Sequence, residues 1–130
     1  MRPVRVRGPE PLHVTIVSAN PETLDGLQTY LRQAGVDARG TREIESGVAM
    51  DPHPSAAVFF PDEYPPDDVL KEVARLRRER PQVLVVLVTR EPQRFAKALE
   101  AGEHTSTIVV PKPVWGWVIL DAIRGRLETP

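Results

Sequence analysis

The sequence predicts an α/β domain in which a doubly wound, five-stranded parallel sheet carries helices on both faces. Three observations lead to this fold class. Short apolar runs alternate with amphipathic segments, and this alternation occurs five times along the chain. The first run, Leu12–Ser18, is rich in β-branched residues, as is typical of a strand buried on both faces. Parallel strands need crossover connections, so the intervening helices must lie against the sheet.

The first strand and helix are the most clearly delimited pair. A β-branched run ends at Ser18, and Asn20 then stands at a position suited to cap a helix. Pro21 fits the first helical position, and Gly35 fits the end of the helix. The apolar stripe of this expected helix consists of Leu24, Leu27 and Leu31.

The later elements differ in how strongly the sequence predicts them. The second strand is short, and the second helix is interrupted by Gly47, so the sequence predicts both of them only weakly. The third helix has a regular apolar stripe and is followed by Pro81, and the fourth strand is the most hydrophobic stretch of the chain. The expected strands are Leu12–Ser18, Val36–Arg39, Ala56–Phe60, Gln82–Thr89 and Ser106–Val110. The expected helices are Asn20–Gly35, Arg42–Met50, Asp67–Arg80, Glu91–Gly102 and Val114–Leu127.

Composition limits the classes of function. The 130 residues have 41% hydrophobic and 27% charged side chains and a net charge of -1, so nucleic acid and membrane surfaces are not expected partners. There is no cysteine for disulfides or thiolate chemistry, and the three histidines share no metal-ligand spacing. We expect a cytoplasmic protein without a cofactor. Residues 1–11 are expected to form a mobile tail, and residues 12–130 the domain.

A site would lie at the carboxyl ends of the strands. For the flavodoxin-like strand order 2-1-3-4-5, the order reverses between strands 1 and 3, and ligands of doubly wound sheets bind at such a point. The loops there are "SAN" (Ser18–Asn20) and "PDEYPP" (Pro61–Pro66). "TRE" (Thr89–Glu91) and "PKP" (Pro111–Pro113) complete the rim.

These motifs, in this order, resemble a response-regulator receiver domain of the CheY-like type over roughly residues 12–127. The matching segments are "IVSANP", "VFFPDEYP", "VLVT" and "VVPKPV". In that family two acids after the first strand hold Mg²⁺, and an aspartate at the end of the third strand accepts a phosphoryl group. A Thr or Ser ends the fourth strand, and a Lys-Pro pair follows the fifth.

Only part of the family's site is present. Thr89 and the Lys112-Pro113 pair match, and the resemblance implies a cis bond before Pro113. The acid pair falls on Ser18 and Ala19, and the phosphoacceptor position falls on Pro61. The side chains of Ser18 and Asn20 offer only neutral oxygens, whereas phosphoryl transfer needs a carboxylate nucleophile and a cation held by carboxylates. The chain is therefore interpreted as a degenerate pseudo-receiver, with Lys112 lacking its usual carboxylate partner.

Asp62 and Glu63 come one and two residues too late in this register. A one-residue shift along a strand turns a side chain to the other face, so Asp62 would reach the site only if the loop bulged. Two alternatives remain open. The domain is an atypical receiver phosphorylated at Asp62, or it binds a small ligand in the pocket vacated between "SAN" and "PDEYPP".

Without phosphotransfer, we expect a role in binding other proteins in bacterial signal transduction or regulation, not an enzyme. The resemblance points to the face of helix 4, strand 5 and helix 5 (Glu91–Gly102, Ser106–Val110 and Val114–Leu127), and a homodimer is possible there. Val109 replaces the family's switch aromatic. Trp115 and Trp117 cannot both lie on the apolar stripe of the last helix, so at least one is expected to be exposed and to mark an interface.

Overall fold

The computed structural model describes residues 12–44, 55–100 and 107–128. The expected tail 1–11 and most of the expected helix Arg42–Met50 lie outside these residues. The described strands are β1 (His13–Val17), β2 (Asp37–Thr41), β3 (Ala56–Phe59), β4 (Leu84–Thr89) and β5 (Thr107–Pro111). The helices are α1 (Pro21–Gln33), α2 (Pro66–Glu79), α3 (Pro92–Glu100) and α4 (Gly116–Glu128), with a 3₁₀ turn, η2 (Pro61–Glu63), between β3 and α2.

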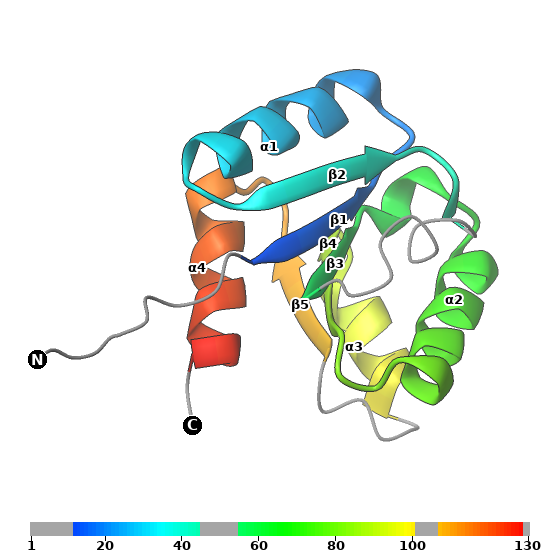
Figure 1. The fold of residues 1–130 in the computed structure, drawn as a ribbon. Helices are drawn as coiled ribbons and strands as arrows, with labels where there is room; N and C mark the ends of the chain where they lie inside the picture. The colour runs from blue at the N-terminus through cyan, green and yellow to red at the C-terminus, as the bar shows by residue number, and fades with distance from the viewer. Residues whose placement is uncertain (1–11, 45–54, 101–106, 129–130) are drawn as a thin grey trace, which may run out of the picture.

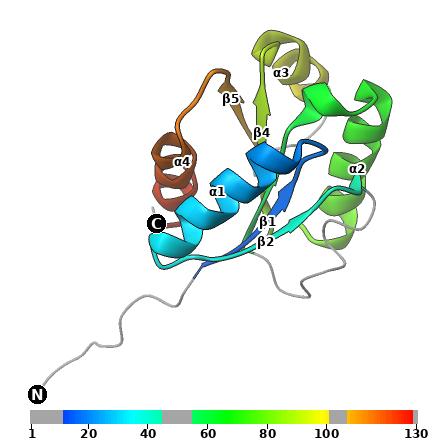
Figure 2. The ribbon, with the colours of Figure 1, turned by 90° about the horizontal axis from the view of Figure 1, so that it is seen from above.

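The five strands form one parallel sheet in the order β2-β1-β3-β4-β5, which confirms the predicted fold class. Helices α1 and α4 cover one face, and α2 and α3 cover the other (Figures 1 and 2). This arrangement follows from right-handed crossovers between parallel strands. None of the described helices is long and apolar enough to cross a membrane.

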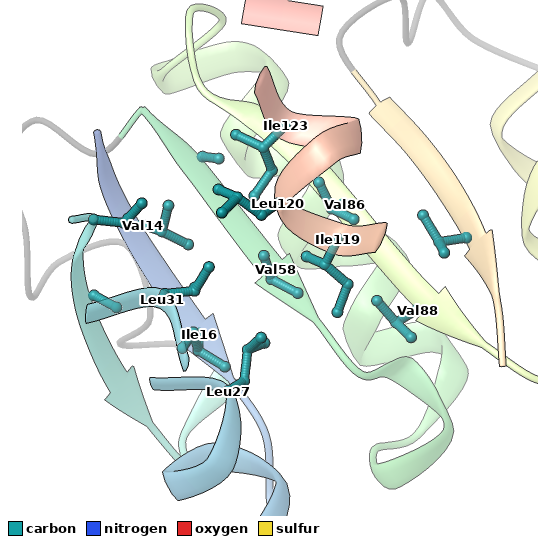
Figure 3. Close-up of a cluster of buried hydrophobic side chains, with 14 of the residues drawn as sticks. Val14, Ile16, Leu27, Leu31, Val58, Val86, Val88, Ile119, Leu120 and Ile123 are labelled. Atoms are coloured by element: carbon teal, nitrogen blue, oxygen red, sulfur yellow. The ribbon is translucent and has the colours of Figure 1, made fainter. Parts of the chain in front are cut away.

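Alternation along the strands divides the core between the two faces. On β1, Val14 and Ile16 point toward α1 and α4, whereas Val17 belongs to the cluster under α2 and α3. Figure 3 shows the first of these clusters, in which Leu27 and Leu31 of α1 meet the sheet beside residues of α4. The α4 residues in that view are Ile119, Leu120 and Ile123.

Helix α1 begins and ends as its sequence predicts. The Asn20 side-chain oxygen accepts hydrogen bonds from the amides of Glu22 (2.9 Å) and Thr23 (3.3 Å). At the other end Gly35 has a φ of 87°, a left-handed conformation that favours glycine. These caps fix where the chain leaves β1 and enters β2, and they set the loop Ser18–Asn20 at the carboxyl edge of the sheet.

Candidate functional site

The candidate site lies at the carboxyl edge of the sheet, where the loops after β1, β3, β4 and β5 meet. Strand β3 lies between β1 and β4 and pairs with both, so residues just after Phe59 can reach the loop on either side. The amide of Lys112 donates to the carbonyl of Thr89 (2.9 Å), which joins the loops after β4 and β5. The topology therefore brings four separate segments together at one edge.

The turn η2 decides where the two acids after β3 point. Strand β3 ends at Phe59, one residue earlier than expected, and Pro61, which is buried, begins the 3₁₀ turn. The Glu63 amide donates to the Phe60 carbonyl (3.1 Å). Successive side chains in such a turn are about 120° apart, since it has three residues per turn. Asp62 and Glu63 are therefore directed to different neighbouring loops.

Asp62 reaches the loop after β4. Thr89 Oγ1 donates a hydrogen bond to its Oδ1 (2.5 Å), and the Arg90 amide donates to its Oδ2 (2.8 Å). The expectation that Asp62 would face away from the site is therefore wrong. It assumed an extended chain beyond Phe60, whereas Pro61 turns the chain and the alternation of a strand no longer applies.

The surroundings of Asp62 favour its ionised form. Partial burial, the largest single influence, raises the pKa of this carboxyl, but the Thr89 and Arg90 hydrogen bonds and the charges of Lys112 and Arg90 together lower it below its ordinary value of 3.8. A depressed folded-state pKa adds stability that is present above the ordinary value and is lost as the pH falls through the folded value. The carboxylate is thus a fixed negative charge at neutral pH.

Glu63 reaches the opposite loop, after β1. Its Oε1 accepts hydrogen bonds from Ser18 Oγ (2.7 Å), the Ala19 amide (2.8 Å) and the Asn20 amide (3.3 Å). Ser18 is fully buried, and its hydroxyl oxygen also accepts a hydrogen bond from the Asn20 amide (3.1 Å). Sequence reasoning placed Glu63 too late to matter. The local sequence contains no signal for these contacts, because Ser18–Asn20 lie 43–45 residues before Glu63.

The Glu63 carboxylate occupies the space between the two loops where a vacated pocket was expected. A hollow of about 290 Å³ lies elsewhere, between α1, the end of β3 and the start of α4. Phe60, Tyr30, Val114 and Gly116 are among the residues that line it. Glu63 therefore takes up part of the position at which the small-ligand alternative placed its ligand.

Thr89 and Lys112 both lie at the site. Thr89 is fully buried, and its Oγ1 also accepts a hydrogen bond from the Glu91 amide (3.0 Å). Lys112 is half-buried, with Nζ 5.4 Å from the centre of the Phe60 ring. Its positive charge is one of the influences that lower the pKa of Asp62. The Lys112-Pro113 peptide bond is cis, as the resemblance implied.

The described residues contain no group of three or more His, Cys, Asp or Glu side chains that could hold a metal ion. Ser18 and Ala19 stand where the resemblance placed a pair of acids, and the donors there already bond to Glu63. A hard cation such as Mg²⁺ prefers several anionic oxygens. The side chains around the loop after β1 therefore do not fit a divalent cation.

The two tryptophans lie beside this edge, at the start of α4. Trp115 is 73% exposed and Trp117 is 56% exposed, so both meet the expectation that at least one would be exposed. The Trp115 carbonyl accepts hydrogen bonds from the Val118 (3.0 Å) and Ile119 (3.4 Å) amides, so Trp115 stands just outside the helix. Val109, on β5, is half-buried against the cluster under α2 and α3.

No family model and no curated protein matches the sequence. Solved structures, however, share its architecture. A CheY-like response regulator receiver domain protein from Methanospirillum hungatei JF-1 superposes with a TM-score of 0.76 at 18% identity, covering 92% of this chain and 95% of its own. A sensor protein from Polaromonas sp. JS666 gives 0.75 at 16% identity, with 92% and 98% covered.

A third structure, described as the BeF3-activated DrrB receiver domain, gives a TM-score of 0.71 at 19% identity, covering 92% of this chain and 99% of its own. At such identities the similarity concerns the fold. The strand order, the four loops at the carboxyl edge and these superpositions agree. This chain has the fold of the CheY-like receiver domains of two-component response regulators.

Proposed function

We propose that this domain is a pseudo-receiver that is not phosphorylated and that binds other proteins independently of phosphorylation. Its setting is bacterial signal transduction or regulation in the cytoplasm, and it is not an enzyme. Protein partners bind at the α3–β5–α4 face, where a second copy of the chain is one such partner. The proposal requires neither nucleic acid nor a membrane.

The residues at the carboxyl edge support the absence of phosphotransfer. Pro61 has no nucleophile at the position where the resemblance places the phosphoacceptor. Ala19 has no ligand atom in its side chain, and Glu63 already takes the hydrogen bonds of the loop Ser18–Asn20. Phosphoryl transfer depends on a bound cation and an in-line carboxylate nucleophile, and these residues supply neither in the usual arrangement.

The two exposed tryptophans support the proposal that the domain binds another protein. Trp115 and Trp117 are 73% and 56% exposed, although a buried tryptophan would add far more to stability. Tryptophan is enriched among the residues that dominate the binding energy of protein interfaces. Two such side chains at one helix start, next to the loop of Lys112, are best accounted for by a protein partner that covers them.

A second candidate is an atypical receiver that is phosphorylated at Asp62. One observation favours it, because the Asp62 carboxylate contacts Thr89 and lies within reach of the Lys112 charge. Both carboxylate oxygens of Asp62, however, already accept hydrogen bonds, which makes each a poorer nucleophile. This candidate requires a covalent phosphoryl adduct at Asp62, whereas the pseudo-receiver requires none.

Capture of partners from a lysate of the source organism tests the proposal. The immobilised domain is expected to retain the same proteins, with the same affinity for the purified partner, in EDTA and in Mg²⁺ with acetyl phosphate. The phosphodonor should have no effect, because binding does not depend on a phosphorylated state. Retention that appears or disappears with the phosphodonor would contradict the proposal, provided that the partner itself is not modified.

A further inference from the structure

We propose that the Asp62 carboxylate is a latch: it ties η2 to Thr89 and Arg90 at the end of β4 and, through Thr89, holds the start of α3 and the loop before α4 in position. The latch comprises Asp62, Thr89, Arg90 and Lys112. It deepens the proposed function by assigning the device that holds the interaction face in one arrangement without a ligand. The hydrogen bonds of the latch do not depend on the proposed function; only its role in holding the α3–β5–α4 interaction face rests on that function.

Two donors hold the Asp62 carboxylate. Each carboxylate oxygen has its own donor, Thr89 Oγ1 for Oδ1 and the Arg90 amide for Oδ2. The Arg90 amide and the Thr89 hydroxyl come from successive residues, so the carboxylate bridges two adjacent points of one loop. Hydrogen bonds to an ionised acceptor are stronger than those between neutral groups.

Two positive charges also favour the ionised form of Asp62. Lys112 and Arg90 both act on the Asp62 carboxylate, and they come from the loops after β5 and β4 respectively. Without Asp62, the Thr89 hydroxyl and the Arg90 amide would lose their shared acceptor beside these two positive charges. The turn after β3 thus supplies a carboxylate to these donors.

The hydrogen bonds leading away from Thr89 connect the latch to the proposed interface. Thr89 Oγ1 accepts from the Glu91 amide (3.0 Å), so its own hydrogen is left for Asp62, and Glu91 immediately precedes α3. The Thr89 carbonyl accepts from the Lys112 amide (2.9 Å), and Trp115 follows Lys112 by three residues. By holding Thr89, the Asp62 carboxylate acts on a residue that is bonded both to the entry into α3 and to the segment that carries Trp115.

Amide hydrogen exchange of the purified protein, read residue by residue by NMR, tests the latch. In Asp62→Ala, exchange at Arg90 and Glu91 is expected to accelerate by about tenfold, the effect of losing one hydrogen bond. Asp67→Ala is the matched control, since Asp67 is an exposed acid in the first turn of α2 and its removal changes the net charge equally. It should leave both amides unchanged.

An added anion that restores amide protection in Asp62→Ala would show that the negative charge of Asp62 matters, and not only the packing of its side chain. Inorganic phosphate or sulfate is expected to restore protection at Arg90 in Asp62→Ala, relative to chloride at equal ionic strength, and to do nothing in Asp62→Ala/Lys112→Ala. If Asp62→Ala does not fold, Asp62→Asn serves instead: it keeps the size, removes the charge, and should accelerate Arg90 exchange severalfold.

Unchanged Arg90 exchange in the Asp62 variants, or equal protection in phosphate and chloride, would overturn the latch. Neither result needs a partner, so either would leave the proposed function intact. Conversely, phosphodonor-dependent capture would refute the proposed function while the exchange result stood.

Discussion

A variant with both Trp115→Ala and Trp117→Ala is expected to bind its protein partner about 30-fold or more weakly than the wild type, since truncating an interface hot spot costs about 2 kcal/mol or more. The two side chains are 73% and 56% exposed, so their removal should change the free energy of unfolding by less than about 0.5 kcal/mol. Isothermal titration calorimetry with the purified partner measures the first quantity, and urea denaturation the second.

The matched control is Leu127→Ala. Leu127 is the other large hydrophobic side chain of α4 that is exposed (37%), and it lies at the opposite end of the helix. Its removal should leave partner affinity unchanged if the interface is centred on the start of α4. Equal affinity of the wild type and the double tryptophan variant would show that this face is not the binding surface.

Phe59→Ala is expected to lower the free energy of unfolding by about 3–5 kcal/mol, the usual cost of emptying a buried phenylalanine site. Phe59 is fully buried on β3, the central strand, and packs in the cluster under α2 and α3. A domain of this kind has only about 5–15 kcal/mol of stability, so the variant should be close to unfolding at 37 °C.

Urea denaturation followed by circular dichroism measures this loss, with Leu127→Ala as a surface control. A loss below about 1 kcal/mol would mean that β3 is not packed as described. The measurement matters for the site as well, because Phe59 anchors the strand from which η2 begins.

The fold could be predicted because its signals are local and repeated. The continuous apolar run Leu84–Val88 and the capped helix Pro21–Gln33 each identify an element without knowledge of the rest of the chain. The strand order followed from the resemblance and from general rules of parallel sheets. The boundaries were less certain: β3 ends at Phe59 rather than Phe60, and α4 begins at Gly116 rather than Val114.

The sequence predicted where the site lies, but not which of its residues form hydrogen bonds with one another. Ser18, Thr89 and Lys112 were expected at the carboxyl edge and lie there. The roles of Asp62 and Glu63 could not be predicted, because they depend on a single 3₁₀ turn begun by Pro61. Strand alternation gave the wrong direction for Asp62, and nothing in the local sequence announces that Glu63 bonds to a loop 43–45 residues earlier.

The exposure of both tryptophans also could not be predicted from the local sequence. The spacing of Trp115 and Trp117 implied that they could not share the apolar stripe, but it did not decide how many would be exposed. The answer depends on the start of α4, where Gly116 packs closely on Tyr30 of α1 and a Cβ atom at this position would lie 3.0 Å from the ring. That contact joins segments far apart in the chain.

Intact-mass spectrometry after incubation with Mg²⁺ and acetyl phosphate shows whether the domain accepts a phosphoryl group. We expect the wild-type mass to remain unmodified, because Pro61 supplies no nucleophile and the carboxylates of Asp62 and Glu63 are held by internal hydrogen bonds. A receiver domain known to be phosphorylated, treated in parallel, controls for the phosphodonor. A stoichiometric phosphoryl adduct on the wild type that is absent from Asp62→Asn would contradict the account.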